Sequence, residues 1–128
     1  MEWVIEGVLA RAARPGRYEP DVAIHTAVEE WIAEAQGMGI QSIICLMPEA
    51  ELKDKYGQFG INLLQLYKRS GFQVHQQPVV DHQIPPVGEA DLAQIVAAFD
   101  DSAQPVLIHC SAGIDRTGAA IDALLEQF

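Results

Sequence analysis

Residues 105–118 read PVLIHCSAGIDRTG, and they join a short apolar run to a glycine-containing turn and the start of a helix. The apolar run 105–109 has the length of a buried strand, and Gly113 permits a positive φ in the turn that follows. In such a strand–turn–helix unit, successive backbone N–H groups converge on one point, where the helix dipole also favours negative charge. The stretch therefore predicts a phosphate cradle, whose members are Ser111, Ala112, Gly113, Ile114, Asp115 and Arg116.

Strand-like and helix-like segments alternate along the rest of the chain. Apolar residues at helical spacing predict helices over roughly 21–36, 59–69 and 116–127, and another with a face formed by Leu92, Ile95, Val96 and Phe99. Short apolar runs predict strands at 3–5, 8–10, 42–47, 72–80 and 105–109. The fold class is therefore α/β, with a central, mostly parallel sheet flanked by helices. Ligands of such sheets bind beyond the carboxyl ends of the strands, where the cradle lies.

The composition is that of one folded domain spanning residues 1–128. Hydrophobic residues make up 49% of the chain, enough for a core, and the formal net charge is −10, from 8 Lys+Arg against 18 Asp+Glu. An acidic surface repels nucleic acid and anionic membranes, so we expect no nucleic acid partner and no stable membrane association. Two cysteines are too few for a disulfide scaffold, and the acidic N-terminus is no signal peptide. These features favour a cytoplasmic protein.

Four side chains of the stretch carry chemistry that suits a phosphate ester. A helix N-terminus and a nearby cation lower the pKa of a thiol, so Cys110 is placed to attack a bound phosphate as a thiolate. The planar guanidinium of Arg116 matches two phosphate oxygens, which a lysine cannot do. Thr117 is able to donate a hydrogen bond to the sulfur, and His109 to orient the loop through its ring nitrogens. The competing interpretation, an inert core cysteine before a structural turn, does not require this whole set.

The same stretch resembles the signature of the protein tyrosine phosphatase superfamily, in its compact dual-specificity branch. The resemblance implies a fold of that type and hydrolysis of phosphate monoesters through a phosphocysteine, with Cys110 as nucleophile and Arg116 as phosphate clamp. The family usually continues for one or two helices after the cradle helix, whereas this chain stops at Phe128, so we expect a minimal or a truncated domain. The positions that match are His109, Cys110, Gly113, Arg116, Thr117 and Gly118.

Asp81 is the leading candidate for the general acid that protonates the leaving oxygen. It follows a predicted strand and opens the proline-bearing run Asp81–Pro86, which is similar to the general-acid loop of small dual-specificity phosphatases. The alternative interpretation is an ordinary turn residue. His82 and Asp115 are rival acids, but we favour a solvated loop histidine for the first and a hydrogen-bond acceptor at the start of the helix for the second.

Outside the cradle, several residues have two interpretations each. Arg11, Arg14 and Arg17 either lie near the mouth of the pocket or are solvated, and we favour solvation. Cys45 is a small core residue or a redox partner of Cys110, and we favour the core. The apolar final helix needs cover, which a homodimer contact through that helix would supply.

The expected substrate is a phosphorylated protein that carries phosphotyrosine or phosphoserine/threonine, since the chain is too short for the larger tyrosine-specific domain. A phosphoinositide or other phospho-metabolite phosphatase is the alternative, because the run Asp115-Arg116-Thr117 resembles lipid-directed relatives. A catalytically weak phosphate-binding module is a further alternative. A rhodanese-type sulfurtransferase also uses a cysteine loop after a strand, but it needs neither the Asp81 loop nor Thr117-Gly118. With four His and two Cys in no metal-binding arrangement, we expect no metal and no cofactor.

Overall fold

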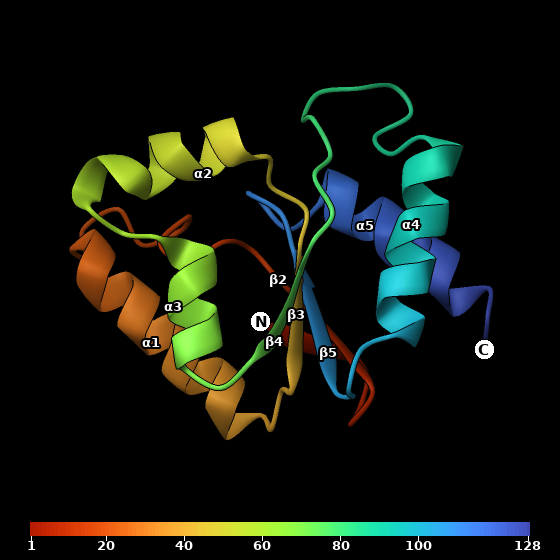
Figure 1. Cartoon of the computed structure of the whole chain (residues 1–128), viewed down its shortest axis with the longest axis horizontal. Helices are drawn as coiled ribbons and strands as arrows, with labels where there is room; N and C mark the ends of the chain where they lie inside the picture. The colour runs from red at the N-terminus through yellow and green to blue at the C-terminus, as the bar shows by residue number, and fades with distance from the viewer.

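A five-stranded sheet with the order β1-β2-β5-β3-β4 forms the centre of the structure, a computed structural model that describes residues 1–128 (Figure 1). β1 and β2 are antiparallel, whereas β2, β5, β3 and β4 are mutually parallel. The predicted α/β class with a mostly parallel central sheet is therefore confirmed. The strands are β1 (Glu2–Ile5), β2 (Leu9–Ala12), β3 (Ser42–Cys45), β4 (Gln73–Gln76) and β5 (Val106–His109).

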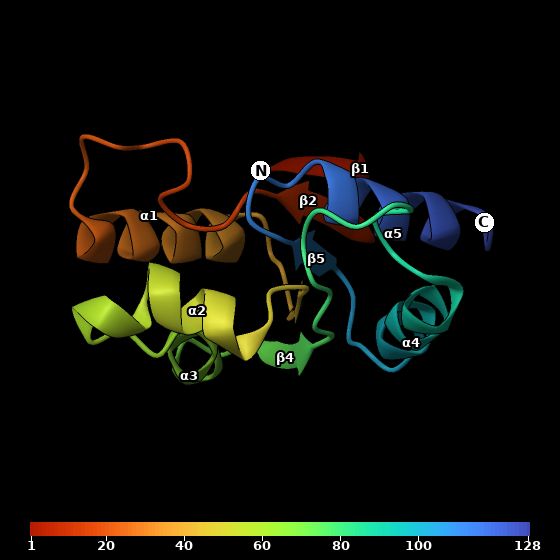
Figure 2. The ribbon, with the colours of Figure 1, turned by 90° about the horizontal axis from the view of Figure 1, so that it is seen from above.

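Helices cover both faces of the sheet, so the molecule has three layers (Figures 1 and 2). One face is covered by α1 (Ile24–Gly37), α2 (Glu49–Lys55) and α3 (Leu63–Arg69), with a 3₁₀ turn, η1 (Gly57–Phe59), between the last two. The other face is covered by α4 (Glu89–Asp100) and α5 (Asp115–Leu125). Because the inner strands are buried on both faces, they read as continuous apolar runs.

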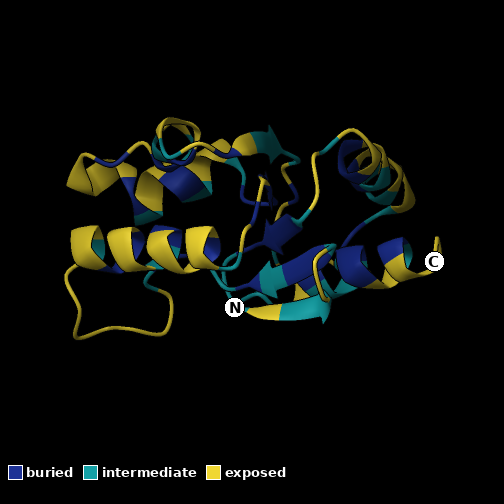
Figure 3. Ribbon diagram, turned by 90° about the horizontal axis from the view of Figure 1, so that it is seen from below, coloured by how far each residue is buried: buried dark blue, intermediate teal, exposed yellow.

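Each face of the sheet has its own hydrophobic core, because successive side chains of a strand point to opposite faces. In β3, Ile43 joins a cluster of 16 buried residues on the side of α1 and α3. Its neighbour Ile44 joins a cluster of 14 buried residues on the side of α4 and α5. The inner strands are accordingly buried, while the outer surfaces of the helices are exposed (Figure 3).

Two predicted elements differ clearly from the observed ones, and one observed helix was not predicted. The strand expected over 72–80 ends at Gln76, because Pro78 lacks the N–H that a sheet ladder requires and the chain then leaves the sheet. The helix expected over 59–69 begins only at Leu63, where the side chain of Asn62 accepts from the N–H of Gln65, because Gly60 adopts a φ of 74° and ends the preceding turn. The short helix α2 was not predicted, since its seven residues show too little periodicity.

The final helix, expected over 116–127, covers Asp115–Leu125, and most of its apolar face is buried within the chain. Ala120, Ile121 and Leu124 pack in the same core as α4, which leaves Leu125 and Phe128 exposed. None of the helices combines the length and the apolar character needed to cross a bilayer.

The carboxyl ends of the four parallel strands lie at one edge of the sheet (Figure 1). A polar or reactive residue of interest follows each of them: Arg14 after β2, Glu51 after β3, Asp81 after β4 and Cys110 after β5. The parallel topology therefore gathers residues from four distant parts of the sequence at one place.

Candidate active site

The thiol of Cys110 lies at the bottom of the site, directly after β5. The side chain is 2% exposed, and its sulfur accepts hydrogen bonds from the Thr117 hydroxyl at 3.0 Å and from the Gly113 N–H at 3.3 Å. These two hydrogen bonds hold the sulfur in a fixed position. The sequence-based expectation that Thr117 bonds the sulfur thus matches the geometry.

The backbone of the cradle is oriented by β2 and by the segment that follows it. The carbonyl oxygens of residues 111–113 accept hydrogen bonds from the backbone N–H of Arg14 (2.9 Å), the hydroxyl of Tyr18 (3.1 Å) and Nη2 of Arg11 (2.8 Å). Since the N–H of a peptide points away from its carbonyl, these bonds turn the following amides toward the cavity. The backbone N–H groups of Ser111, Ala112, Ile114, Asp115 and Arg116 donate to no group of the protein.

Gly113 allows the cradle to approach β2 closely. Its φ is 75°, and a Cβ at this position would lie 2.7 Å from the carbonyl oxygen of Ala12 and 2.7 Å from the nitrogen of Ala13. Any other residue would have both a strained backbone and a collision with main-chain atoms that cannot move aside. The glycine is therefore required by the fold of the cradle itself.

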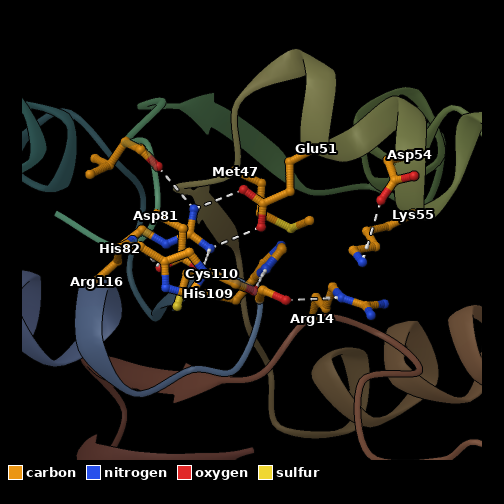
Figure 4. Close-up of polar contacts among 12 residues, drawn as sticks. Arg14, Met47, Glu51, Asp54, Lys55, Asp81, His82, His109, Cys110 and Arg116 are labelled. Atoms are coloured by element: carbon orange, nitrogen blue, oxygen red, sulfur yellow. Dashed lines mark hydrogen bonds and ion pairs between the residues drawn. The ribbon is translucent and has the colours of Figure 1, made fainter. Parts of the chain in front are cut away.

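The guanidinium of Arg116 is buried and held in a fixed orientation. Nη1 donates to Glu51 Oε2 and to the carbonyl of Val79, both at 2.9 Å, and Nη2 donates to Glu51 Oε1 at 2.9 Å (Figure 4). Burial opposes the charge, but the hydrogen bonds and charge of Glu51, with further help from Cys110 and Asp81, raise the pKa of Arg116 above its ordinary value. Nε is buried without any partner, and a phosphate oxygen in the cradle would supply one.

Asp81 extends from its loop toward the cradle. Its Oδ2 lies 3.3 Å from Nη2 of Arg116 and 3.6 Å from Nε2 of His82, and its side chain is 35% exposed. His82 is exposed, with a φ of 64°, and its own N–H donates to Asp81 Oδ1. Asp115 opens α5 with an exposed side chain that forms no hydrogen bond, so the expected acceptor role at the helix start is wrong.

His109 supports the cradle from below, and each of its two buried ring nitrogens has a hydrogen-bond partner. Nδ1 lies 3.0 Å from the carbonyl of Cys110, which can only accept, so Nδ1 carries the proton and Nε2 accepts from the Tyr67 hydroxyl at 3.0 Å. The ring is fully buried, and this burial lowers the pKa of His109 to about 4, with the charge of Arg116 acting in the same direction and the bond to the Cys110 carbonyl opposing them. The imidazole is therefore neutral at neutral pH.

A cavity of about 600 Å³ opens above Cys110. Only two of its 11 lining residues are apolar, and the wall includes both Cys110 and the candidate acid Asp81. Arg14 and Arg17, which the sequence led us to regard as solvated, line it as well, whereas Arg11 is occupied by the cradle backbone. The lining residues are Arg14, Arg17, Glu51, Lys55, Asp81, His82, Cys110, Ser111, Ala112, Asp115 and Arg116.

Cys45 lies apart from this cavity, in the core on the side of α1. It is fully buried, and burial raises the pKa of its thiol to about 12, so the group stays protonated. This environment suits the core role that the sequence favoured.

Glu51, Lys55 and Tyr67 belong to the site but were not singled out from the sequence. Glu51 and Lys55 lie on α2, beyond the carboxyl end of β3, so the rule that ligands bind at strand ends could have flagged them. Tyr67 offered only the weaker signal of a tyrosine on an apolar helix face, whose hydroxyl needs a partner when buried.

Comparison with known proteins gives a match of residues 20–127 to the family model described as "Polymorphic toxin system, DSP-PTPase phosphatase". Among curated proteins, the cyclin-dependent kinase inhibitor 3 of Mus musculus is 30% identical over 118 residues, which is 91% of this chain and 54% of that protein. The chain thus spans about half the length of that relative.

Two solved structures have the same fold. A kinase associated phosphatase whose catalytic cysteine is substituted by serine matches with a TM-score of 0.68 and 25% identity, over 93% of this chain and 65% of that one. The core catalytic domain of the PP-IP phosphatase SIW14 of S. cerevisiae matches with a TM-score of 0.64 and 23% identity, over 97% of this chain and 64% of that one.

Proposed function

Because the chain belongs to the DSP-PTPase phosphatase family of polymorphic toxin systems, we propose that it hydrolyses phosphate monoesters through a phosphocysteine at Cys110. One observation carries this proposal: in the turn that begins at Cys110, the backbone N–H groups of residues 111, 112 and 114–116 and the Nε of Arg116 have no partner in the protein. Such donors match the oxygens of a phosphoryl group and stabilise the charge that develops on them during transfer.

In the first step the Cys110 thiolate attacks phosphorus while the bond between phosphorus and the ester oxygen breaks. Asp81 donates its proton to that oxygen, which leaves as an alcohol, and the phosphoryl group remains on sulfur. Arg116 holds two of the phosphoryl oxygens through Nε and Nη2, and Glu51 keeps the guanidinium in the required plane. Because Asp81 contacts the same Nη2, a bound phosphate displaces the carboxylate toward the leaving group.

In the second step water attacks the phosphocysteine, and the Asp81 carboxylate accepts a proton from it. The bond between sulfur and phosphorus breaks, inorganic phosphate forms, and the electron pair returns to Cys110. The hydroxyl of Thr117, 3.0 Å from the sulfur, stabilises the departing thiolate. His109 takes no proton in this scheme, because it is buried and neutral; it is a positioning residue for the cradle.

The proposal is tested with Cys110→Ser, and Cys45→Ser is the matched control because it is the other cysteine of the chain. We expect Cys110→Ser to lower hydrolysis of para-nitrophenyl phosphate by about 10⁴-fold or more while phosphate-ester binding measured by calorimetry persists. After an acid quench of labelled substrate, wild-type protein should retain phosphate on Cys110. Wild-type protein that binds the ester without releasing phosphate would instead be the weak binding module.

Two substrate classes fit this chemistry. Phosphotyrosine and phosphoserine/threonine in proteins are the class that the sequence favours, and one structural neighbour is a kinase associated phosphatase. A phospho-metabolite is the second class, and the polar cavity wall supports it, because neither apolar lining residue, Cys110 or Ala112, offers an aromatic face for a tyrosine ring.

A further inference from the structure

We propose that the cavity has a second anion subsite, formed by Arg14 with Arg17 and Lys55, and that the substrate is a compact polyol bearing two phosphates on adjacent carbons. The inference rests on the proposed function, since one of the two phosphates would occupy the cradle at Cys110. The free polyol phosphate and the headgroup of a phosphoinositide share this chemistry.

The distribution of charge in the chain supports this subsite. The protein has a net charge of −10 and only 8 Lys+Arg, yet four of those eight, including Arg116, line this one cavity. Arg116 is already paired with Glu51, so Arg14, Arg17 and Lys55 are available for other anions. A monophosphate bound at Cys110 does not need three additional cations.

The cations outside the cradle lack strong protein partners. No carboxylate lies within 4.0 Å of the guanidinium of Arg14 or Arg17, and Lys55 pairs only with its exposed neighbour Asp54, at 3.4 Å. An exposed pair of this kind contributes little and is readily exchanged for a ligand. A phosphate group would therefore meet cations that the protein has not neutralised.

Arg14 is held in place beside the cradle rather than extended into solvent. Its Nε donates to Ser111 Oγ at 3.2 Å, its backbone N–H bonds the carbonyl of Ser111, and its guanidinium lies over the ring of Tyr56 at 5.8 Å. Because Ser111 belongs to the cradle, a phosphate bound by Arg14 lies close to the one at Cys110. This proximity is the reason to expect phosphates on adjacent carbons.

The two sides of the cavity differ in charge (Figure 4). Arg14 and Lys55 lie on one side of Cys110, and Asp81 and His82 lie on the other. In the proposed mechanism the leaving oxygen faces Asp81, and a second phosphate directed away from Asp81 would meet Arg14 and Lys55. A volume of about 600 Å³ is within the range of roughly 300–1,000 Å³ that encloses a small ligand, and its polar wall suits a hydroxylated ring.

The test compares phosphate release from an inositol monophosphate with that from an inositol bisphosphate whose phosphates are on adjacent carbons. We expect kcat/KM to be at least tenfold higher for the bisphosphate, the factor associated with one charge-assisted hydrogen bond. Arg14→Gln should lower the ratio of the two kcat/KM values about tenfold, and Lys55→Gln should lower it several-fold. Raising the ionic strength should reduce the ratio as well.

Lys53→Gln is the matched control, because it removes the same charge as Lys55→Gln. Lys53 is exposed on the same helix as Lys55 but does not line the cavity. We expect this variant to leave the ratio unchanged. A ratio that falls equally in Lys53→Gln and Lys55→Gln would reflect net charge alone and would overturn the subsite.

Further arms identify the source of the phosphates and separate the two proposals. The same headgroup is then presented as phosphatidylinositol bisphosphate in phosphatidylcholine vesicles. A kcat/KM higher than that of the soluble bisphosphate supports a lipid source, and a kcat/KM that is not higher supports a metabolite source. Turnover of the monophosphate with no preference for the bisphosphate, or with a higher kcat/KM for a phosphotyrosine peptide, overturns the subsite but leaves the phosphatase. No turnover of any ester overturns the proposed function itself.

Discussion

The two segments that meet at Cys110 are held in opposite ways. The cradle, residues 111–116, is anchored from below by His109 and Tyr67, and its three successive carbonyls are bound by Arg11 of β2 and by Arg14 and Tyr18 after β2. The acid loop, residues 80–87, takes part in no backbone–backbone hydrogen bond, and residues 82–85 are exposed. Both segments follow a parallel strand, but β5 lies between β2 and β3, whereas β4 is at the edge of the sheet and has a neighbour on one side only.

The well-bonded cradle and the weakly bonded loop suit two different tasks, binding phosphate and transferring a proton. Phosphate donors must already be in position when charge develops, because reorganising them during the reaction would raise the barrier. An acid that first donates and later accepts a proton has to follow the leaving group and then the water, so a segment with few contacts can be displaced at low cost. We therefore expect damage to the cradle to affect both stability and turnover, and damage to the loop to affect turnover alone.

Among the tests of this contrast between cradle and loop, Asp81→Asn should have the largest effect. The variant should lose about 10²- to 10³-fold in kcat on alkyl phosphates, whose leaving oxygen needs a proton, and clearly less on para-nitrophenyl phosphate. Its melting temperature should stay near that of the wild type, because the side chain is partly exposed and its loop is weakly bonded. A larger loss in His82→Gln than in Asp81→Asn would assign the acid to the histidine.

Gly113→Ala should damage the cradle itself. Gly7 has the same φ of 75°, but no atom lies within 4 Å of the position that a Cβ would take there, so Gly7→Ala isolates the cost of the backbone conformation, about 1 kcal/mol. In Gly113→Ala the collision with Ala12 and Ala13 adds about 2 kcal/mol, and turnover should fall with stability. Urea unfolding of both variants measures the difference, and equal losses would contradict the close approach to β2.

The buried imidazole should make the cradle sensitive to acid. The folded pKa of His109, about 4, lies below the ordinary value of 6.5, so the unfolded chain binds the proton first as the pH falls. This group alone should lower the free energy of unfolding by about 1.5 kcal/mol between pH 6.5 and pH 5. In His109→Gln that part of the pH dependence should disappear, as measured by urea unfolding at several pH values. If the free energy of unfolding changed with pH in the variant as it does in the wild type, the imidazole would not be held neutral.

Glu51→Gln should have the smallest effect, because it removes a charge but keeps an oxygen that can accept from Arg116. One of the two parallel hydrogen bonds is lost, and we expect kcat/KM to fall about tenfold. Glu49→Gln, an exposed position in the first turn of the same helix, is the control and should change kcat/KM less than twofold. Equal effects of the two substitutions would show that the pair does not orient the guanidinium.

Local chemistry made the cradle predictable from the sequence. A strand, a glycine turn and a helix start are encoded within 14 consecutive residues, so His109, Cys110 and Arg116 could be assigned roles without knowledge of the rest of the chain. The helix α1 was predicted over 21–36, close to its observed bounds, and the predicted apolar face of Leu92, Ile95, Val96 and Phe99 lies within α4. The segments that failed, α2 and the residues after Gln76, are short and lack a sustained period.

By itself, the sequence determined the α/β class and pointed to Cys110 as the candidate nucleophile, residues 111–116 as the candidate phosphate cradle and Asp81 as the candidate acid, because each depends on residues near one another in the chain. Only the tertiary structure decided what surrounds them: Glu51 on the guanidinium of Arg116, Tyr67 on His109, and the placement of Arg14 and Lys55 at the cavity wall. These contacts join the ends of different parallel strands. Their partners are set by the strand order β1-β2-β5-β3-β4, which no local pattern encodes.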